Sequence, residues 1–173
     1  MTPSSSCNSV TVRRFAGDEW PLYRALRLRS LDDAPGAFGS TLAREQALAD
    51  QDWAWRLGLA ARSGRDHPLL AEVDGAAAGL AWAKFDANDP QLVNLFQMWV
   101  APECRGRGVA AALLAEALVW ARSRRARTMG LGVMGGNHAA ARLYERAGFK
   151  PFGEPEPARP GDARMEQAMR LDL

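Results

Sequence analysis

A turn rich in arginine and glycine precedes a long apolar segment in the middle of the chain. Residues 101–121 read "APECRGRGVAAALLAEALVWA", in which Arg105 and Arg107 alternate with Gly106 and Gly108. If a helix opens here, its first N–H groups lack intrahelical partners and lie at the positive end of the helix dipole. Glycines let a bulky anion approach the backbone, and arginines add full charges. The stretch therefore predicts a phosphate or pyrophosphate site, while the same residues also suit a tight, solvated turn.

A dinucleotide-binding loop is the first alternative for this turn. The segment "GRGVAA" matches the fingerprint G-x-G-x-x-A through Gly106, Gly108 and Ala111. That fingerprint requires a tight turn directly after a strand and an acidic residue at the end of the next strand. Here residues 101–104 intervene, and the next expected strand runs into "GVMGGN", which has no carboxylate. A dinucleotide-binding module is therefore disfavoured.

A second group of residues that could take part in a reaction lies in "NHAAARLYERAGF", residues 137–149. Tyr144 is one of two tyrosines in the chain and follows Asn137 by seven residues, so on a helix both share one face about 10 Å apart. A phenol has a reference pKa of about 10, stays neutral at physiological pH and can donate a proton. Asn137 suits a helix N-cap. On these residues alone a core aromatic beside Leu143 and Ala140 is favoured for Tyr144 over an acid catalyst.

The elements that must position these groups follow from periodicity and capping signals. Strands are predicted over residues 9–15, 67–86 (two strands joined at Asp74-Gly75), 91–100, 128–133 and 164–173. Helices are predicted from a cap at Asp18, from Thr41 to about Arg62, from about Gly106 to Arg124, and over residues 137–150. The run at 91–100 is apolar nearly throughout, as in a strand buried on both faces. The order predicts an α/β or α+β domain with one core and one mixed sheet.

Composition bounds the class of protein. The chain has 173 residues, which suits one domain, here residues 9–173 after a loose tail at 1–8. The net charge of +2 is too small to favour binding to nucleic acid or to a membrane surface. The basic run "RSRRAR" at 122–127 lacks an aromatic stacking set and is interpreted as a solvated helix end. No nucleic-acid partner is expected.

The sequence also predicts the cellular location and the absence of a metal site. No apolar run reaches 18 residues, and the N-terminus lacks the apolar core of a signal peptide, so we expect a cytoplasmic protein without a membrane span. Two cysteines and two histidines cannot supply a zinc site with usual spacing, so no metal is expected. Cys104 precedes the predicted helix, but an ordinary loop cysteine is favoured over a covalent nucleophile.

Together, the two motifs resemble a known superfamily. The pattern V-x-P-x-x-R-G-x-G-x-A is similar to the pyrophosphate loop of the GNAT superfamily of acyl-CoA-dependent N-acetyltransferases, with Arg105, Gly108 and Ala110 at the signature places. Asn137, Tyr144 and Gly148-Phe149 resemble its second motif. The resemblance covers roughly residues 9–173. It implies a GNAT fold: a mixed, mostly antiparallel, twisted sheet of six to seven strands, flanked by helices and splayed between the fourth and fifth strands.

The resemblance also implies a donor site. Acetyl-CoA would lie in the splay as acyl donor, with Tyr144 as general acid toward the CoA thiolate. A strand N–H near Met98 would stabilise the tetrahedral intermediate. The residues that the resemblance implies for acetyl-CoA binding are Met98, Trp99, Val100, Arg105, Gly106, Arg107, Gly108, Val109, Ala110, Ala111 and Asn137.

The general base is where the sequence departs from the resemblance. Asn94 and Gly132 stand at the places where family members often carry a glutamate, and neither accepts a proton at neutral pH. The titratable candidates elsewhere are Glu45, Asp32, Asp33 and His138. The missing glutamates leave an alternative open, in which the chain is a non-catalytic acyl-CoA-binding or sensing domain on the same fold.

The acceptor is expected to be a primary amine, on a small molecule or a peptide. In the family, specificity comes mainly from the first two helices and nearby loops, here roughly residues 18–63. Asp32 and Asp33 near Phe38 suit a cationic amine with an apolar portion, and suit a helix end equally. The sequence leaves open which amine is acetylated and whether the chain forms a homodimer.

Overall fold

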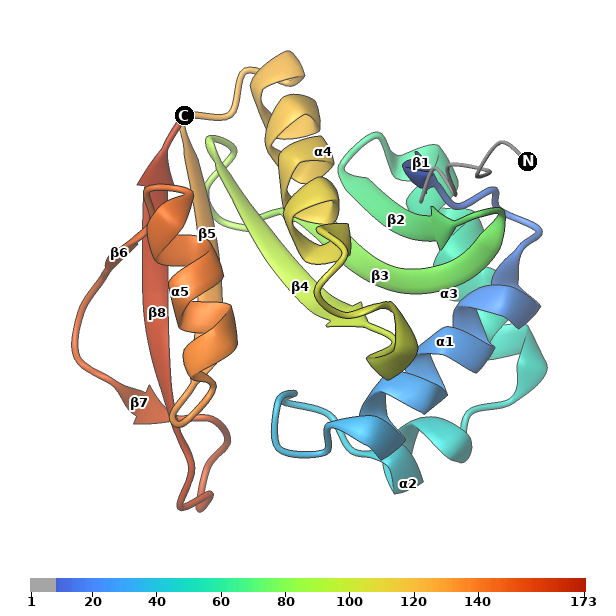
Figure 1. Cartoon of the computed structure of the whole chain (residues 1–173), viewed down its shortest axis with the longest axis horizontal. Coiled ribbons are helices and arrows are strands. Elements are labelled where there is room, and N and C mark those ends of the chain that lie inside the picture. Colours follow the sequence, from blue (N-terminus) through green and yellow to red (C-terminus); the bar gives the residue numbers. More distant parts are fainter. Residues whose placement is uncertain (1–8) are drawn as a thin grey trace, which may run out of the picture.

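The structure, a computed structural model, describes residues 9–173, and the predicted tail at 1–8 lies outside the described residues. Eight strands form one sheet in the order β1-β2-β3-β4-β5-β8-β6, with β7 also paired to β8 (Figure 1). The strands are β1 (Val10–Arg14), β2 (Asp66–Val73), β3 (Ala76–Phe85), β4 (Leu92–Val100), β5 (Thr128–Met134), β6 (Lys150–Pro151), β7 (Glu156–Pro157) and β8 (Met165–Asp172). Only β4 and β5 pair in parallel among these strands. The predicted mixed, mostly antiparallel sheet is confirmed, with two additional two-residue strands.

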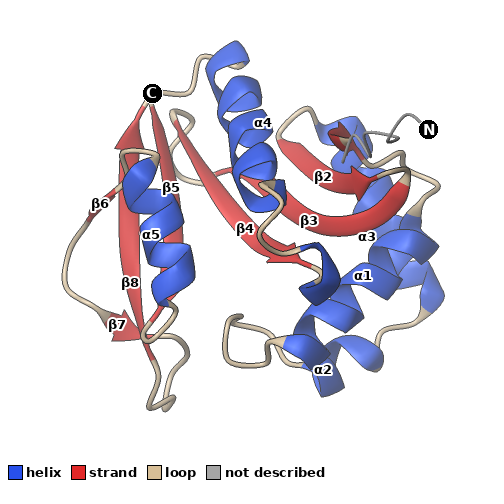
Figure 2. Cartoon of the chain, viewed as in Figure 1, coloured by secondary structure: helices blue, strands red, loops and turns tan. Residues whose placement is uncertain are grey.

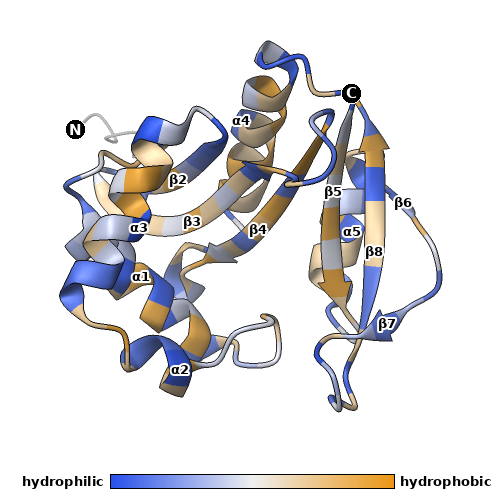
Figure 3. Ribbon diagram, turned by 180° about the vertical axis from the view of Figure 1, so that it is seen from behind, coloured by the Kyte–Doolittle hydropathy of each residue, from blue (hydrophilic) through white to orange (hydrophobic). Residues whose placement is uncertain are grey.

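Helices cover the sheet on both faces (Figure 2). They are α1 (Trp20–Asp33), α2 (Leu42–Gln46), α3 (Asp50–Ser63), α4 (Val109–Ser123) and α5 (His138–Arg146), with a 3₁₀ turn η1 at Pro102–Cys104. One core lies between the sheet and α4 and α5, and α4 is apolar over most of its length (Figure 3). A second core lies on the opposite face, where α1 and α3 pack on β2, β3 and β4. Among residues 9–173 no helix is long and apolar enough to cross a bilayer.

Three predicted helix boundaries were wrong. Asp18 does not cap α1: Glu19 stands at the N-cap without a side-chain cap bond, because its carboxylate binds Arg13 and the Ala16 N–H. The single helix expected after Thr41 is two helices, because the Asp52 carboxylate accepts the Ala49 N–H and starts α3 anew.

The third boundary is that of α4, which begins at Val109 rather than near Gly106. Gly106 and Gly108 have φ of +75° and +79°, outside the right-handed helical region. The Asp74-Gly75 turn is confirmed: both residues have positive φ, as a two-residue hairpin of type I′ requires.

The strand β4 was expected to be buried on both faces, but some of its side chains are exposed where the sheet splits. Phe96 is 50% exposed. Beside it, Gln97 has φ +57°, and the β3–β4 register shifts between Leu80 and Trp82, which marks a β-bulge. The Tyr23 hydroxyl donates to Gln97 Oε1 at 2.9 Å and holds the bulged residue from α1.

The parallel pairing of β4 with β5 is short. It spans three register pairs, from Leu92 with Thr128 to Asn94 with Gly130. Beyond this last pair the two strands diverge, and the ribbon of Figure 1 shows them separating from a common end. The predicted splay between the fourth and fifth strands is therefore confirmed, and it positions the site described next.

Candidate functional site

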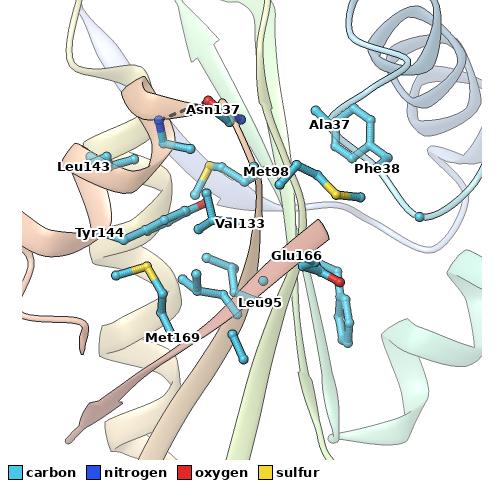
Figure 4. A pocket seen from close by; sticks show the side chains of 18 of the residues that line it. Ala37, Phe38, Leu95, Met98, Val133, Asn137, Leu143, Tyr144, Glu166 and Met169 are labelled. Atoms are coloured by element: carbon cyan, nitrogen blue, oxygen red, sulfur yellow. Dashed lines mark hydrogen bonds between the residues drawn. The ribbon is translucent and has the colours of Figure 1, made fainter. Parts of the chain in front are cut away.

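A large cavity occupies the splay. Its volume is about 1270 Å³, and β4 and β5 form its two long walls. The turn before α4 contributes Arg105, and the first turn of α4 contributes Ala110. Tyr144 of α5 also lines the cavity (Figure 4). The loop after α1 adds Phe38, and β8 adds Glu166. The cavity thus gathers the two sequence motifs at one place.

The edge of β4 that faces the cavity directs backbone N–H groups toward β5. The Ala101 N–H donates to the Ala78 carbonyl of the preceding strand pair at 2.8 Å. Backbone groups alternate along a strand, so those of Val100 and Met98 face away from β3, toward β5. Trp99 instead pairs with Leu80. Of the three residues predicted to bind through backbone, Met98 and Val100 are therefore suitably directed and Trp99 is not.

Arg105 ties the turn to the end of β4. Its Nε donates to the Val100 carbonyl at 3.1 Å, and its guanidinium pairs with Asp33. The Asp33 carboxylate also accepts the Trp99 indole N–H at 2.8 Å. The indole hydrogen bond first, and then Arg105, hold the pKa of Asp33 below its usual range. Asp33 is therefore an anchor for the turn, and its candidacy as general base was wrong.

The turn before α4 presents its backbone to solvent. At Gly106 and Gly108 a Cβ would meet nothing within 4 Å, and Gly108 caps the helix without any side-chain bond. The first intrahelical bond of the ladder runs from the Ala112 N–H to the Gly108 carbonyl at 3.0 Å. The three N–H groups before it, those of residues 109–111, point out of the helix end. Such an end fits a pyrophosphate.

The remaining turn residues lie beyond the cavity wall. Arg105 and Ala110 line the cavity, whereas Gly106, Arg107, Gly108, Val109 and Ala111 do not. The Val109 side chain is buried in the core, so it offers only its N–H. These residues extend the site outward along the turn, where the charged end of a long ligand would lie.

On α5, both predicted residues line the cavity. The Asn137 side chain accepts the Ala140 N–H at 3.2 Å, so its role as N-cap is confirmed. Tyr144 is 5% exposed and packs edge-on against Phe149, with ring centroids 5.8 Å apart. Burial raises the pKa of Tyr144 to about 12, so the phenol is neutral at physiological pH.

The other predicted bases lie outside the cavity walls. Glu45 is buried with Arg27 at 3.0 Å and Arg56 at 3.3 Å. Burial would raise the pKa of Glu45, but the hydrogen bond and charge of Arg27 outweigh burial and lower it. Asp32 and His138 are exposed and do not line the cavity. All four predicted bases, Asp33 included, are therefore corrected: two hold structure and two face solvent.

Comparison with known proteins identifies the family. Residues 25–149 match the model of the acetyltransferase (GNAT) family. The chain belongs to this GNAT family. Over 145 residues it is 32% identical to a mycothiol acetyltransferase of Salinispora arenicola, covering 81% of this chain and 44% of that protein. The chain thus spans about half the length of the curated relatives it matches.

Solved structures support the GNAT fold. A GNAT-family acetyltransferase from Streptococcus pneumoniae superposes with a TM-score of 0.80 at 24% identity, over 95% of this chain and 99% of that one. A phosphinothricin acetyltransferase from Sinorhizobium meliloti, solved in complex with AcCoA, gives 0.78 at 20% identity, over 95% and 88%. At these identities the likeness concerns the fold.

One cavity residue escaped the sequence reasoning. Glu166 of β8 lies on the cavity wall, and its carboxylate occupies the space beside Gly132 of β5. An ideal Cβ on Gly132 would lie 1.8 Å from Glu166 Oε1. Gly132 is the position where GNAT members often carry a glutamate. Only the antiparallel register of β5 with β8, which places Ala168 opposite Gly132, would have revealed this carboxylate.

Proposed function

We propose that this GNAT chain transfers an acetyl group from acetyl-CoA to a primary amine. The observation that carries the proposal is the cavity between β4 and β5, with the open helix end of α4 at one side and the Tyr144 phenol in its wall. A cavity bounded in this way can hold a long ligand with an anionic end and a reactive end. Acetyl-CoA supplies the activated acyl group.

The binding residues act mainly through backbone. The Met98 and Val100 edge of β4 pairs with the amide-containing arm of the donor. The N–H groups of residues 109–111, with Arg107, hold the pyrophosphate, while Arg105 braces the turn through Asp33. The Met98 N–H, directed into the gap, is the proposed donor to the thioester oxygen as negative charge develops there.

Tyr144 is the proposed general acid. Its hydroxyl lies in the cavity wall, and its raised pKa keeps the phenol protonated at physiological pH. As the CoA thiolate leaves, the Tyr144 hydroxyl hydrogen-bonds to its sulfur and donates a proton, which a proton from the acceptor nitrogen then replaces. A purely acyl-CoA-sensing domain has no need of this proton, so the buried phenol favours catalysis over the sensing alternative.

The acceptor enters from the side of the loop after α1. Phe38, Phe96 and Met98 give this part of the cavity an apolar wall. The curated relatives are named for mycothiol, so a mycothiol-related amine is the first small molecule to test. Small apolar amines and short peptides complete the acceptor panel.

Calorimetric titration with acetyl-CoA, with NAD as the comparison ligand, tests the donor site. Gly108→Glu places a negative charge at the α4 end, and we expect a loss of about 2 kcal/mol, roughly 30-fold in Kd. Gly75→Glu is the matched control, since Gly75 also has a positive φ and open space but lies in the β2–β3 turn. Equal affinity of both variants, or a preference for NAD, would overturn the donor assignment.

A further inference from the structure

The GNAT chain lacks a glutamate at Asn94 and Gly132, yet its cavity contains a carboxylate at one of these places. Gly130 and Gly132 lie on the face of β5 opposite to Leu131 and Val133, which pack into the core beneath α4 and α5. A Cβ on Gly130 would meet Asn94 Oδ1 at 2.8 Å, and one on Gly132 would meet the Glu166 carboxylate. The two glycines therefore leave space that neighbouring strands fill with polar groups.

We propose that Glu166 binds the ammonium group of the acceptor and removes its proton before attack. This rests on the proposed acetyl transfer. Gly132 lies two residues beyond the last β4–β5 pair, where the splay opens. The Glu166 carboxylate beside it therefore lies at the start of the gap.

Tyr144 and Glu166 approach the gap from opposite faces of the sheet. Tyr144 belongs to the core on the α5 face, with Val133. Glu166 lies beside Gly132 on the opposite face, and Figure 4 shows the Tyr144 and Glu166 side chains on opposite sides of the cavity. An acid for the leaving group and a base for the incoming group are thus separated by the space where the acyl carbon would lie.

The charged side chains on the cavity wall do not pair with Glu166, so its carboxylate can bind a cation. The other charged residues on the cavity wall are Glu154, Glu156, Arg105 and Arg170. Arg105 is engaged with Asp33, and the Arg170 guanidinium lies 3.6 Å from the centroid of the Phe152 ring. Glu156 is the register partner of Glu166 across β7 and β8 and adds negative charge rather than a counterion. An acceptor ammonium would supply the missing positive charge.

Burial raises the pKa of Glu166, which increases its basicity toward an ammonium. The proton balance is complete. The acceptor nitrogen loses one proton before attack and a second one after the C–N bond has formed, as the C–S bond breaks. One proton reaches the CoA sulfur by way of the Tyr144 hydroxyl, and one leaves to water by way of Glu166.

The test compares Glu166→Gln with wild type on two kinds of amine. The cationic probe is whichever of 2-phenylethylamine and 4-phenylbutylamine wild type acetylates faster, and the second probe is 4-methoxyaniline, whose amino group is neutral at pH 7. CoA release is followed with a thiol reagent from pH 6 to pH 10. We expect kcat/KM for the cationic probe to fall by about 100-fold at pH 7 and to recover as pH rises, with 4-methoxyaniline little affected.

Glu156→Gln is the matched control, because it removes the same charge from the neighbouring strand. A similar loss in Glu156→Gln, or an equal loss of Glu166→Gln on both probes at every pH, would overturn the assignment of Glu166 as base. Unchanged turnover in Glu166→Gln overturns this inference while leaving acetyl transfer in place. A wild-type protein that binds acetyl-CoA but acetylates no amine overturns the proposed function itself.

Discussion

The two halves of the sheet differ on the face that lies away from α4 and α5. Over β1–β4 this face is covered by α1 and α3, with Trp53 and Leu57 fully buried. Over β5 and β8 the same face is open and lines the cavity with Gly130, Gly132 and Glu166. The ribbon shows the contrast: α1 and α3 lie on the side of β2, β3 and β4, away from β5 and β8 (Figure 1). The first half of the sheet is therefore covered on both faces, whereas the second half leaves one face of β5 and β8 open to the cavity.

Two glutamates give the largest expected contrast. Glu45→Gln breaks a buried pair with Arg27 in the first half, and we expect a loss of about 3–5 kcal/mol in the free energy of unfolding at pH 7. The lowered pKa of Glu45 makes this stabilisation present above the unfolded-state pKa and lost as pH falls through the folded one. Urea denaturation at pH 7 and pH 4 measures it.

Glu166→Gln should behave oppositely in the same experiment. The pKa of Glu166 is raised, so its ionisation costs stability as pH rises above the unfolded-state value. The variant should therefore lose no stability at pH 7. A large loss would show that the Glu166 carboxylate stabilises the packing of β5 and β8.

The two tyrosines, one in each half, give the next contrast. Tyr144→Phe should lower kcat about 100-fold, equivalent to about 2.7 kcal/mol, without loss of stability, because its hydroxyl is the proposed acid. Tyr23→Phe removes the hydrogen bond to Gln97 and should cost about 1 kcal/mol of stability. Steady-state kinetics and thermal melts are run on both variants. Unchanged turnover in Tyr144→Phe would refute the general-acid role.

Alanine substitutions at two strand glycines distinguish an effect on packing from an effect on turnover. A Cβ at Gly79 would lie 2.6 Å from the Trp99 backbone carbonyl, whereas at Gly132 it would meet the movable end of Glu166. We expect Gly79→Ala to destabilise the protein by about 1–3 kcal/mol. Gly132→Ala should cost less than that and instead lower turnover, by displacing the Glu166 carboxylate. Denaturant midpoints and kcat/KM, measured for both variants, test these two expectations.

The smallest expected effects concern two helix caps. Thr41 accepts the Arg44 N–H and Asn137 accepts the Ala140 N–H, both at 3.2 Å. Replacing either with alanine should cost about 1 kcal/mol of stability. If Asn137 also contacts the donor, only Asn137→Ala will raise the calorimetric Kd for acetyl-CoA. Equal Kd values would restrict Asn137 to capping.

The parts of the fold and of the site that could be predicted are those determined by short segments of sequence. The Arg105–Gly108 turn and the Asn137–Tyr144 helix are short segments whose residue types fix their own geometry, and their family spacing indicated the GNAT fold. The break between α2 and α3 carries no glycine or proline and depends on the Asp52 cap. Sequence reasoning therefore extended one helix through it.

The carboxylates were placed wrongly for a different reason. Glu45 became a candidate because it titrates, but its burial against Arg27 depends on how α1 and α2 pack. Glu166 was overlooked because its position beside Gly132 arises from the pairing of strands more than thirty residues apart in the chain. Such long-range register has no local signature, and it decides which side chain enters the cavity.

The alternating backbone of β4 beyond its bulge has a consequence for amide hydrogen exchange. The Trp99 N–H lies on the side paired with β3, so it exchanges only when that strand pair opens. The N–H groups of Met98 and Val100 face the gap and exchange without any such opening. A ligand that pairs with this edge slows exchange at Met98 and Val100 and leaves Trp99 unchanged, so the pattern of protection locates a bound donor to within one residue.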